Sequence, residues 1–199
     1  FVFRMDDLYQ VEHLLRDKTP NDISKTFGDP RYLRIQPKIG SSYRGFLPIM
    51  TGCDNFCTFC IVPYSRGRET SRTISEVLLE ARRMASLGIT EIVLLGQNVN
   101  SYGNKNTVYD ETYTDDSERH PFTRLLMEMN TVPGLRRIRF TSPHPKDISE
   151  DLISTMARLD TVCEHVHLPL QSGSNSMLKR MNRHYSAEHF LSLVAMIRT

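Results

Sequence analysis

Residues 52–60, with the sequence G-C-D-N-F-C-T-F-C, place three thiols in one short loop at the spacing C-x3-C-x2-C. A structural cysteine in a protein core is usually solitary, and three neighbours this close can form at most one disulfide. Soft thiolates grouped in this way are the ligands of zinc and of iron–sulfur clusters. Cys53, Cys57 and Cys60 are therefore the candidate metal ligands of the chain.

Three kinds of metal centre compete for this loop. A structural zinc and an electron-transfer cluster normally use four protein ligands, but the loop holds no histidine. The fourth cysteine, Cys163, lies far along the chain among apolar residues, which is typical of an inert core thiol. Three ligands fit best a four-iron cluster in which one iron stays open to a non-protein ligand.

Composition limits the class of protein. A chain of 199 residues with 39% hydrophobic content can bury one sizeable core. The net charge of +2 permits an RNA partner without requiring one. No apolar run reaches transmembrane length, and the few cysteines suit a reducing compartment. We expect an intracellular protein, and the absence of an initial Met and the apolar helical pattern at the last residues predict a fragment of a longer one.

Short apolar runs alternate with amphipathic segments along the chain. The runs lie at residues 46–50, 91–95, 136–140 and 165–170, and each ends in polar residues or glycine. This alternation predicts a parallel sheet with right-handed crossovers, whose ligands bind at the carboxyl ends of the strands. A doubly wound sheet and an open barrel fit the pattern equally well.

Helix signals separate the apolar runs. A capping box of Thr73 and Glu76 opens one helix, which ends at Gly88. Further helices are predicted over residues 122–130 and after Asp147, Ser174 and Ser186, and another within residues 1–17. Residues 19–42 are typical of an irregular linker, and residues 103–120 of a polar surface loop.

Several motifs carry a resemblance to a known family. The C-x3-C-x-aromatic-C pattern resembles the signature of the radical S-adenosylmethionine (SAM) superfamily, and residues 52–72 resemble its methylthiotransferases. L-L-G-Q-N-V-N-S-Y-G, R-F-T-S-P-H-P, H-L-P-L-Q-S-G-S and M-x-R-x-Y are similar to the tRNA-modifying MiaB branch; they lie at residues 94–103, 139–145, 167–174 and 181–185.

The resemblance implies an α/β fold: a partial, open (β/α)6 barrel whose parallel sheet is flanked by helices. It also implies that residues 1–42 are the end of an N-terminal methylthiotransferase domain plus a linker. Residues 43–199 would be the radical SAM core, truncated at its C-terminus.

The resemblance further implies a [4Fe–4S] cluster on the three cysteines and SAM chelated to its open iron. One electron then cleaves SAM and releases a 5′-deoxyadenosyl radical, which a closed pocket must shield from water. The expected SAM contacts are Phe59, Gln97, Ser142, Gln171, Ser172 and Arg183. Gln97 replaces the acidic residue of a Gly-Gly-Glu-like motif that many members carry.

His144 is expected to contact SAM or substrate, or to orient another group. We call residues 52–60 the cluster loop. Arg66, Arg68 and Arg72 follow it within a few residues and would suit binding to the phosphates of a tRNA backbone. A solvated turn is an equal interpretation. The plainer interpretations of Gln97 and Arg183 are a backbone-satisfying amide and a surface cation.

The implied reaction adds a methylthio group to carbon 2 of an isopentenylated adenosine next to the tRNA anticodon. The family's second cluster has its ligands in an N-terminal domain, and this chain has no cysteine before Cys53. We therefore expect SAM binding and cleavage, but no complete methylthiolation by this chain alone.

The implied partners are tRNA and a flavodoxin-like or equivalent electron donor, in the cytoplasm or in a mitochondrial matrix. Alternative substrates are a threonylcarbamoyl-adenosine tRNA or a ribosomal protein. An alternative of another class is a non-catalytic RNA-binding module stapled by metal.

Overall fold

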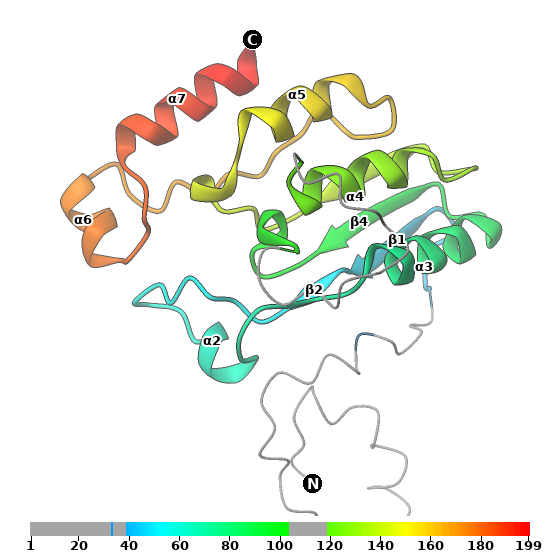
Figure 1. The fold of residues 1–199 in the computed structure, drawn as a ribbon, viewed down its shortest axis with the longest axis horizontal. Helices are drawn as coiled ribbons and strands as arrows, with labels where there is room; N and C mark the ends of the chain where they lie inside the picture. The colour runs from blue at the N-terminus through cyan, green and yellow to red at the C-terminus, as the bar shows by residue number, and fades with distance from the viewer. Residues whose placement is uncertain (1–32, 34–38, 104–118) are drawn as a thin grey trace, which may run out of the picture.

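A three-stranded parallel sheet forms the centre of the fold. The computed structural model describes residues 33, 39–103 and 119–199. The strands are β1 (Arg44–Pro48), β4 (Glu91–Leu95) and β5 (Arg137–Phe140), in the order β1-β4-β5. The register aligns Leu47 with Leu94 and Leu94 with Phe140. The strands run toward the side of the molecule where helices α2 (Val62–Ser65) and α6 (Asn175–Arg180) lie (Figure 1).

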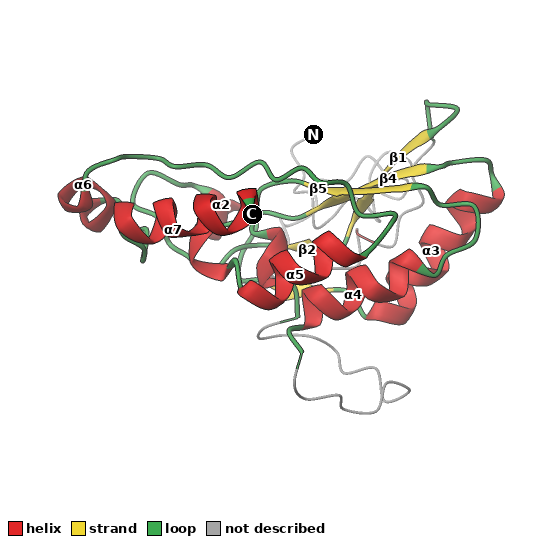
Figure 2. Cartoon of the chain, turned by 90° about the horizontal axis from the view of Figure 1, so that it is seen from above, coloured by secondary structure: helices red, strands yellow, loops and turns green. Residues whose placement is uncertain are grey.

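The main helices cover one face of this sheet. They are α3 (Ile74–Ser86), α4 (Pro121–Asn130) and α5 (Glu150–Arg158), with α7 (Ala187–Arg198) packed against α5. Figure 2 shows α3, α4 and α5 side by side below the strands. Consecutive strands are neighbours in chain order, so right-handed crossovers that advance in one direction place every helix on the same side. This arrangement agrees with the open barrel and not with a doubly wound sheet.

Apolar side chains from the strands and helices form one core. Leu47, Leu94 and Phe140 point toward the helices and are almost completely buried. The rings of Phe122 in α4 and Phe140 in β5 meet edge to face, 5.2 Å apart. None of the helices in the described part of the chain is long and apolar enough to span a bilayer.

The predicted helix starts are confirmed at atomic detail. Thr73 Oγ1 accepts from the backbone N of Glu76, and the Glu76 carboxylate accepts from the backbone N of Thr73. Ser149 and Ser186 cap α5 and α7 in the same way, each through its hydroxyl oxygen. These local signals place the crossover helices and thereby the loops that follow each strand.

The strand predicted at residues 165–170 is wrong. Residue Val162 makes an isolated bridge with Ile138 in β5, and Cys163 N donates to Ile138 O at 3.0 Å. The backbone then folds back on itself, because His165 N donates to Cys163 O at 2.7 Å. Pro169 also lacks the N–H that a ladder needs. The segment therefore leaves the sheet edge as a loop that leads toward α6.

Several short elements escape prediction from the sequence. The apolar run at residues 46–50 divides into β1 and β2 (Met50–Thr51), and β2 pairs antiparallel with β3 (Thr70–Ser71). Short 3-10 turns, η3 (Val99–Ser101) and η4 (Pro145–Asp147), follow β4 and β5. The helix expected within residues 1–17, and most of the linker and of the polar insertion, lie outside the described residues.

A buried carboxylate organises the amino ends of the strands on the face opposite the helices. The Glu91 side chain is 2% exposed, and its two oxygens accept from Arg44 Nε and Arg137 Nε, both at 2.5 Å. A third guanidinium nitrogen, Arg139 Nε, lies 3.7 Å from Glu91 Oε1. Burial by itself raises the pKa of Glu91, but the hydrogen bonds from Arg137 and Arg44 prevail and lower it below its ordinary value of 4.5.

The substitution Glu91→Gln should destabilise the chain near neutral pH, because it removes the only negative charge among these guanidinium groups in the described structure. We expect the melting temperature to fall by about 2–8 °C. The folded pKa lies below the unfolded one, so the Glu91 contribution is present above about pH 4.5 and is lost as the pH falls through the folded pKa. Thermal unfolding of both proteins between pH 3 and 7 measures this.

The exposed Glu164 supplies the control for this series. Glu164→Gln should leave the melting temperature unchanged at every pH. A destabilisation in Glu91→Gln that does not shrink in acid would contradict the assignment of the effect to the Glu91 charge.

Candidate functional site

The three cysteines lie on the loop between β2 and α2, at the carboxyl edge of the sheet. Cys53 and Cys57 are each 8% exposed, and Cys60 is half-buried. Cys60 N donates to Cys57 O at 2.9 Å, which closes a tight turn between these two thiols. All three are free thiols in this structure.

Gly52 lets the chain enter this loop. Its φ of +73° lies in the left-handed region, and a Cβ atom there would stand 2.1 Å from the carbonyl oxygen of Arg68. The returning segment crosses directly over Gly52, and Cys53 N donates to Gly67 O at 3.3 Å. Only glycine permits this backbone contact.

A turn from the C-terminal part of the chain holds the cluster loop from outside. We call residues 180–183 the clamp turn. Asn182 Nδ2 donates to the carbonyl oxygens of Asn55 and Phe56 at 3.1 and 3.0 Å. Thr58 donates twice in return, from its backbone N to Met181 O and from its hydroxyl to Arg180 O. These bonds fix the backbone that carries Cys57.

Arg183, at the end of the clamp turn, contacts Cys57 directly. Its side chain is buried, with 6% exposed, and its Nη1 lies 3.1 Å from Cys57 Sγ. The guanidinium also stacks on the ring of Tyr185, with its carbon 5.4 Å from the ring centroid. A buried cation is therefore placed beside a thiol at fixed distance.

The surroundings of Cys53 disfavour its thiolate form. Burial raises the pKa of Cys53, and the negative charges of Glu69, Cys57 and Cys60 raise it further. A cationic metal centre beside Cys53 would act in the opposite direction and favour its thiolate. Across the described ranges, no three His, Cys, Asp or Glu side chains gather around a single ion.

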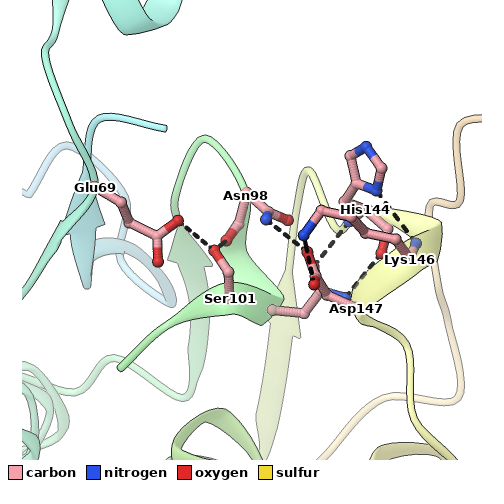
Figure 3. A network of polar contacts seen from close by, with 7 residues as sticks. Glu69, Asn98, Ser101, His144, Lys146 and Asp147 are labelled. Atoms are coloured by element: carbon pink, nitrogen blue, oxygen red, sulfur yellow. Dashed lines mark hydrogen bonds and ion pairs between the residues drawn. The ribbon is translucent and has the colours of Figure 1, made fainter. Parts of the chain in front are cut away.

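The loops after β4 and β5 are joined by a polar network. Asn100 and His144 exchange two bonds: Asn100 Nδ2 donates to His144 O at 3.1 Å, and His144 N donates to Asn100 Oδ1 at 2.8 Å. Asn98 Nδ2 donates to Asp147 at 2.8 Å, and Asp147 pairs with Lys146 at 2.7 Å. Figure 3 shows Asn98, His144, Lys146 and Asp147 together at the ends of neighbouring strands.

The network continues to the segment that follows the cluster loop. Ser101 Oγ donates to Glu69 Oε2 at 2.6 Å, and Glu69 N donates to Asp54 Oδ1 at 3.2 Å. Burial raises the pKa of Glu69 to about 7, against the lowering effect of the Ser101 bond. The cluster loop is therefore connected to the β4 and β5 loops on one side and to the clamp turn on the other.

His144 is held neutral with one nitrogen available. Burial lowers its pKa to about 3, and the positive charge of Arg183 adds to the effect. Lys146 N donates to His144 Nδ1 at 3.2 Å, so Nε2 carries the proton. Nε2 is buried and has no hydrogen-bond partner. In Figure 3 a dashed line joins one imidazole nitrogen to Lys146, and the other ring nitrogen carries none.

Unpartnered buried polar atoms recur among these loops. Besides His144 Nε2 they include Gln97 Oε1, Asn98 Oδ1 and Arg183 Nε. A buried polar atom without a partner is costly, and several in one region indicate the place of a polar ligand. Ser142 and Gln171 have φ angles of +60° and +66°, a left-handed conformation that costs a non-glycine residue free energy and that the surrounding structure must maintain.

The structure places the residues predicted to bind SAM in loops at this edge. Gln97 directly follows β4, while Ser142 and His144 follow β5. The loop of Gln171 and Ser172 is tied to the same region by Tyr185, whose hydroxyl donates to Leu170 O at 2.6 Å and whose ring meets His144 edge to face at 5.6 Å. Phe59, by contrast, is 55% exposed on the cluster loop.

The three predicted tRNA-binding arginines occupy different environments. Arg72 is buried, pairs with Glu80 at 2.8 Å and donates to Pro48 O, so it supports the packing of α3. Arg68 is exposed, pairs with Asp54 at 3.0 Å and stacks on the Phe56 ring. Arg66 is half-buried at the C-terminal cap of α2. Arg66 and Arg68 remain the accessible members of this group.

Sequence reasoning missed the residues that hold others in place. Asn182, Tyr185, Asn100 and Glu69 are not among the predicted site residues, although the first two lie in the M-x-R-x-Y segment and the last two in quoted motifs. Each of these residues is a polar or aromatic side chain inside a motif, to which the sequence analysis gave no role. Asking what each of them could bond would have identified them as candidates. Cys163 lies beside β5 and is only half-buried, so it is not the fully buried core thiol that the sequence predicted.

Comparison with known proteins identifies the family of the chain. Residues 47–199 match the family model "Radical SAM superfamily". A tRNA-2-methylthio-N(6)-dimethylallyladenosine synthase of Finegoldia magna is 51% identical over 160 residues, which cover 80% of this chain and 32% of that protein. The enzyme of the same name from Desulfotalea psychrophila is 44% identical and covers 96% of this chain and 43% of its own. The chain thus spans less than half the length of these relatives.

Solved structures show the same fold. The radical S-adenosylmethionine methyltransferase TsrM from Kitasatospora setae, with tryptophan and a SAM analogue bound, superposes with a TM-score of 0.57 at 18% identity over 79% of this chain and 28% of its own. The cobalamin-dependent S-adenosylmethionine radical enzyme OxsB gives a TM-score of 0.55 at 13% identity, over 76% of this chain and 22% of its own. With a family model matched over most of its length, this chain belongs to the radical SAM superfamily.

Proposed function

We propose that this chain is the radical SAM core of a tRNA methylthiotransferase, in which Cys53, Cys57 and Cys60 hold a [4Fe–4S] cluster. The observation that carries the proposal is the position of three thiols at the carboxyl edge of the sheet, beside loops with unpartnered buried polar atoms. Relatives that are 44–52% identical bear the name of one such enzyme, which supports the choice within the superfamily.

In this proposal the strand-end loops bind SAM. Gln97, Ser142, Gln171 and Ser172 would contact its polar groups, and Phe59 would cover it. The unpartnered Nε of Arg183 would face its carboxylate, and the neutral His144 would donate from Nε2 to SAM or to the substrate base. When bound, the reduced cluster supplies the electron that cleaves the sulfonium carbon–sulfur bond of SAM. The protein's part is to fix these groups and exclude water.

The proposed substrate is an isopentenylated adenosine next to the tRNA anticodon, which is the substrate class that the relatives' names indicate. Such a base must leave its stack to enter the site. Arg66 and Arg68 beside the cluster loop would contact phosphates on the way. The proposed partners are tRNA and a flavodoxin-like or equivalent electron donor, in the cytoplasm.

The proposal assigns residues 43–199 to the radical SAM core and residues 1–42 to the end of a methylthiotransferase domain and its linker. A second [4Fe–4S] cluster, the sulfur source in this family, would be held by residues outside this chain. Incubation of the reconstituted chain with SAM and a strong reductant, followed by assay for 5′-deoxyadenosine, tests the core activity separately from methylthiolation.

Replacing any one of Cys53, Cys57 and Cys60 by Ser should abolish cluster binding, because each thiolate occupies one corner and none has a substitute within the described residues. We expect iron and sulfide to fall to background, and 5′-deoxyadenosine to fall by about 100-fold or more. Both are measured after anaerobic reconstitution. Cys163→Ser is the matched control and should retain wild-type iron content; zinc as the only bound metal in the wild type would refute the proposal.

The substitution Gln97→Leu should weaken SAM binding, because it removes the unpartnered amide oxygen that we assign to the cofactor. We expect Kd for SAM to rise about tenfold, which is about 1.4 kcal/mol, with unchanged iron content. Equilibrium binding to the reconstituted protein measures this. An unchanged Kd would remove Gln97 from the site.

Replacing Arg66 and Arg68 together by Gln should weaken binding of a tRNA anticodon stem-loop. The plot of log K against log salt should flatten by about 0.7–0.9 for each phosphate that the variant no longer neutralises. Fluorescence anisotropy at several salt concentrations measures this slope. Arg82→Gln, at an exposed position of α3, is the control. The same weakening in the control would show a general charge effect and not a local one.

A further inference from the structure

We infer that Arg183 sets the reduction potential of the cluster by donating a hydrogen bond and a positive charge to the Cys57 sulfur. The inference rests on the proposed function, since it needs a cluster on the three cysteines. It assigns to Arg183 a role separate from SAM binding: a positioning and tuning residue that acts on the cluster when no SAM is present.

The contact itself is built into the fold. Nη1 of Arg183 lies 3.1 Å from Cys57 Sγ. Arg183 is 6% exposed and Cys57 is 8% exposed, so the contact is buried. Surface cations are strongly screened by water and salt, whereas a buried cation at this distance is screened much less. Hydrogen bonds to the sulfurs and the net charge nearby are among the determinants of the potential of an iron–sulfur cluster.

The surrounding residues hold the guanidinium in this place. The ring of Tyr185 stacks against it, and Tyr185 is fixed in turn by its hydroxyl bond to Leu170 O. Arg183 N donates to Leu178 O at 3.0 Å, which closes the clamp turn at the end of α6. Asn182, one residue earlier, bonds the carbonyl oxygens of Asn55 and Phe56. The cysteine and the cation are therefore positioned by the same turn.

The direction of the effect follows from charge. Reduction adds one electron to the cluster, and the reduced state is more negative. A buried donor with a positive charge stabilises that state more than the oxidised one, so it raises the potential. The Arg183 Nε without a partner remains free to meet an anionic ligand, so the two functions do not compete for one nitrogen.

The test is a redox titration of the full chain, reconstituted with its cluster and without SAM, followed by electron paramagnetic resonance. Arg183→Met removes the donor and the charge, and Arg183→Gln removes the charge but keeps an amide donor. We expect the cluster of each variant to be at least tenfold harder to reduce, a shift of about 59 mV or more to negative potential. Arg183→Lys should recover part of the shift.

Arg180→Met is the matched control, because Arg180 is an exposed arginine three residues earlier in the same turn. It should keep the wild-type potential. An unchanged potential in either charge-removing variant that holds the cluster overturns the inference, whether or not SAM affinity falls.

Failure of both charge-removing variants to assemble a cluster, with normal circular dichroism, would also overturn the inference and give Arg183 a role in assembly only. Failure of the wild-type chain to hold any iron–sulfur cluster would instead overturn the proposed function. The two failures are therefore distinguishable.

Discussion

The hydrogen bonds between the cluster loop and the clamp turn are the interactions on which the arrangement of the site depends. The cluster loop has no helix or strand between Cys53 and Cys60 that would define its shape. Asn182 compensates by bonding two successive carbonyl groups of the loop, and Thr58 bonds back to the turn twice. Buried carbonyl groups need such partners, so each bond both satisfies the loop and fixes the direction of its thiols.

The sheet supplies the second constraint. Its strands end side by side, so the loops after β4 and β5 must meet, and the Asn100–His144 pair joins them. Through Ser101, Glu69 and Asp54 the same network reaches the cysteine loop. A ligand held by the strand-end loops would therefore lie next to the loop that carries the three thiols.

Much of this organisation follows from local patterns in the sequence. The strand at residues 91–95 and the Thr73–Glu76 capping box depend on neighbouring residues alone, and the structure confirms both. The cysteine spacing likewise identifies the candidate metal ligands without tertiary information. The expected strand at residues 165–170 failed because a backbone turn at Cys163 and His165, invisible in an apolar pattern, takes the chain off the sheet.

Side-chain partners at long range could not be predicted. Arg72 is buried and pairs with Glu80, whereas Arg68 is exposed. The difference arises at β3, a strand of two residues that directly precedes Arg72 and is too short to give a pattern in the sequence. The interaction of Arg183 with Cys57 joins residues 126 positions apart, and no spacing rule relates them. A single sequence considered alone shows which residues can carry chemistry. It does not show which other residues hold them in place.

That separation along the chain has a consequence for how the protein matures. A nascent polypeptide leaves the ribosome from its amino end, so the thiols emerge well before Asn182 and Arg183. Until those residues have been synthesised and have packed, the cysteine loop lacks the bonds that shape it. The loop can therefore take the shape described here only after residues 180–183 have been synthesised and have packed against it.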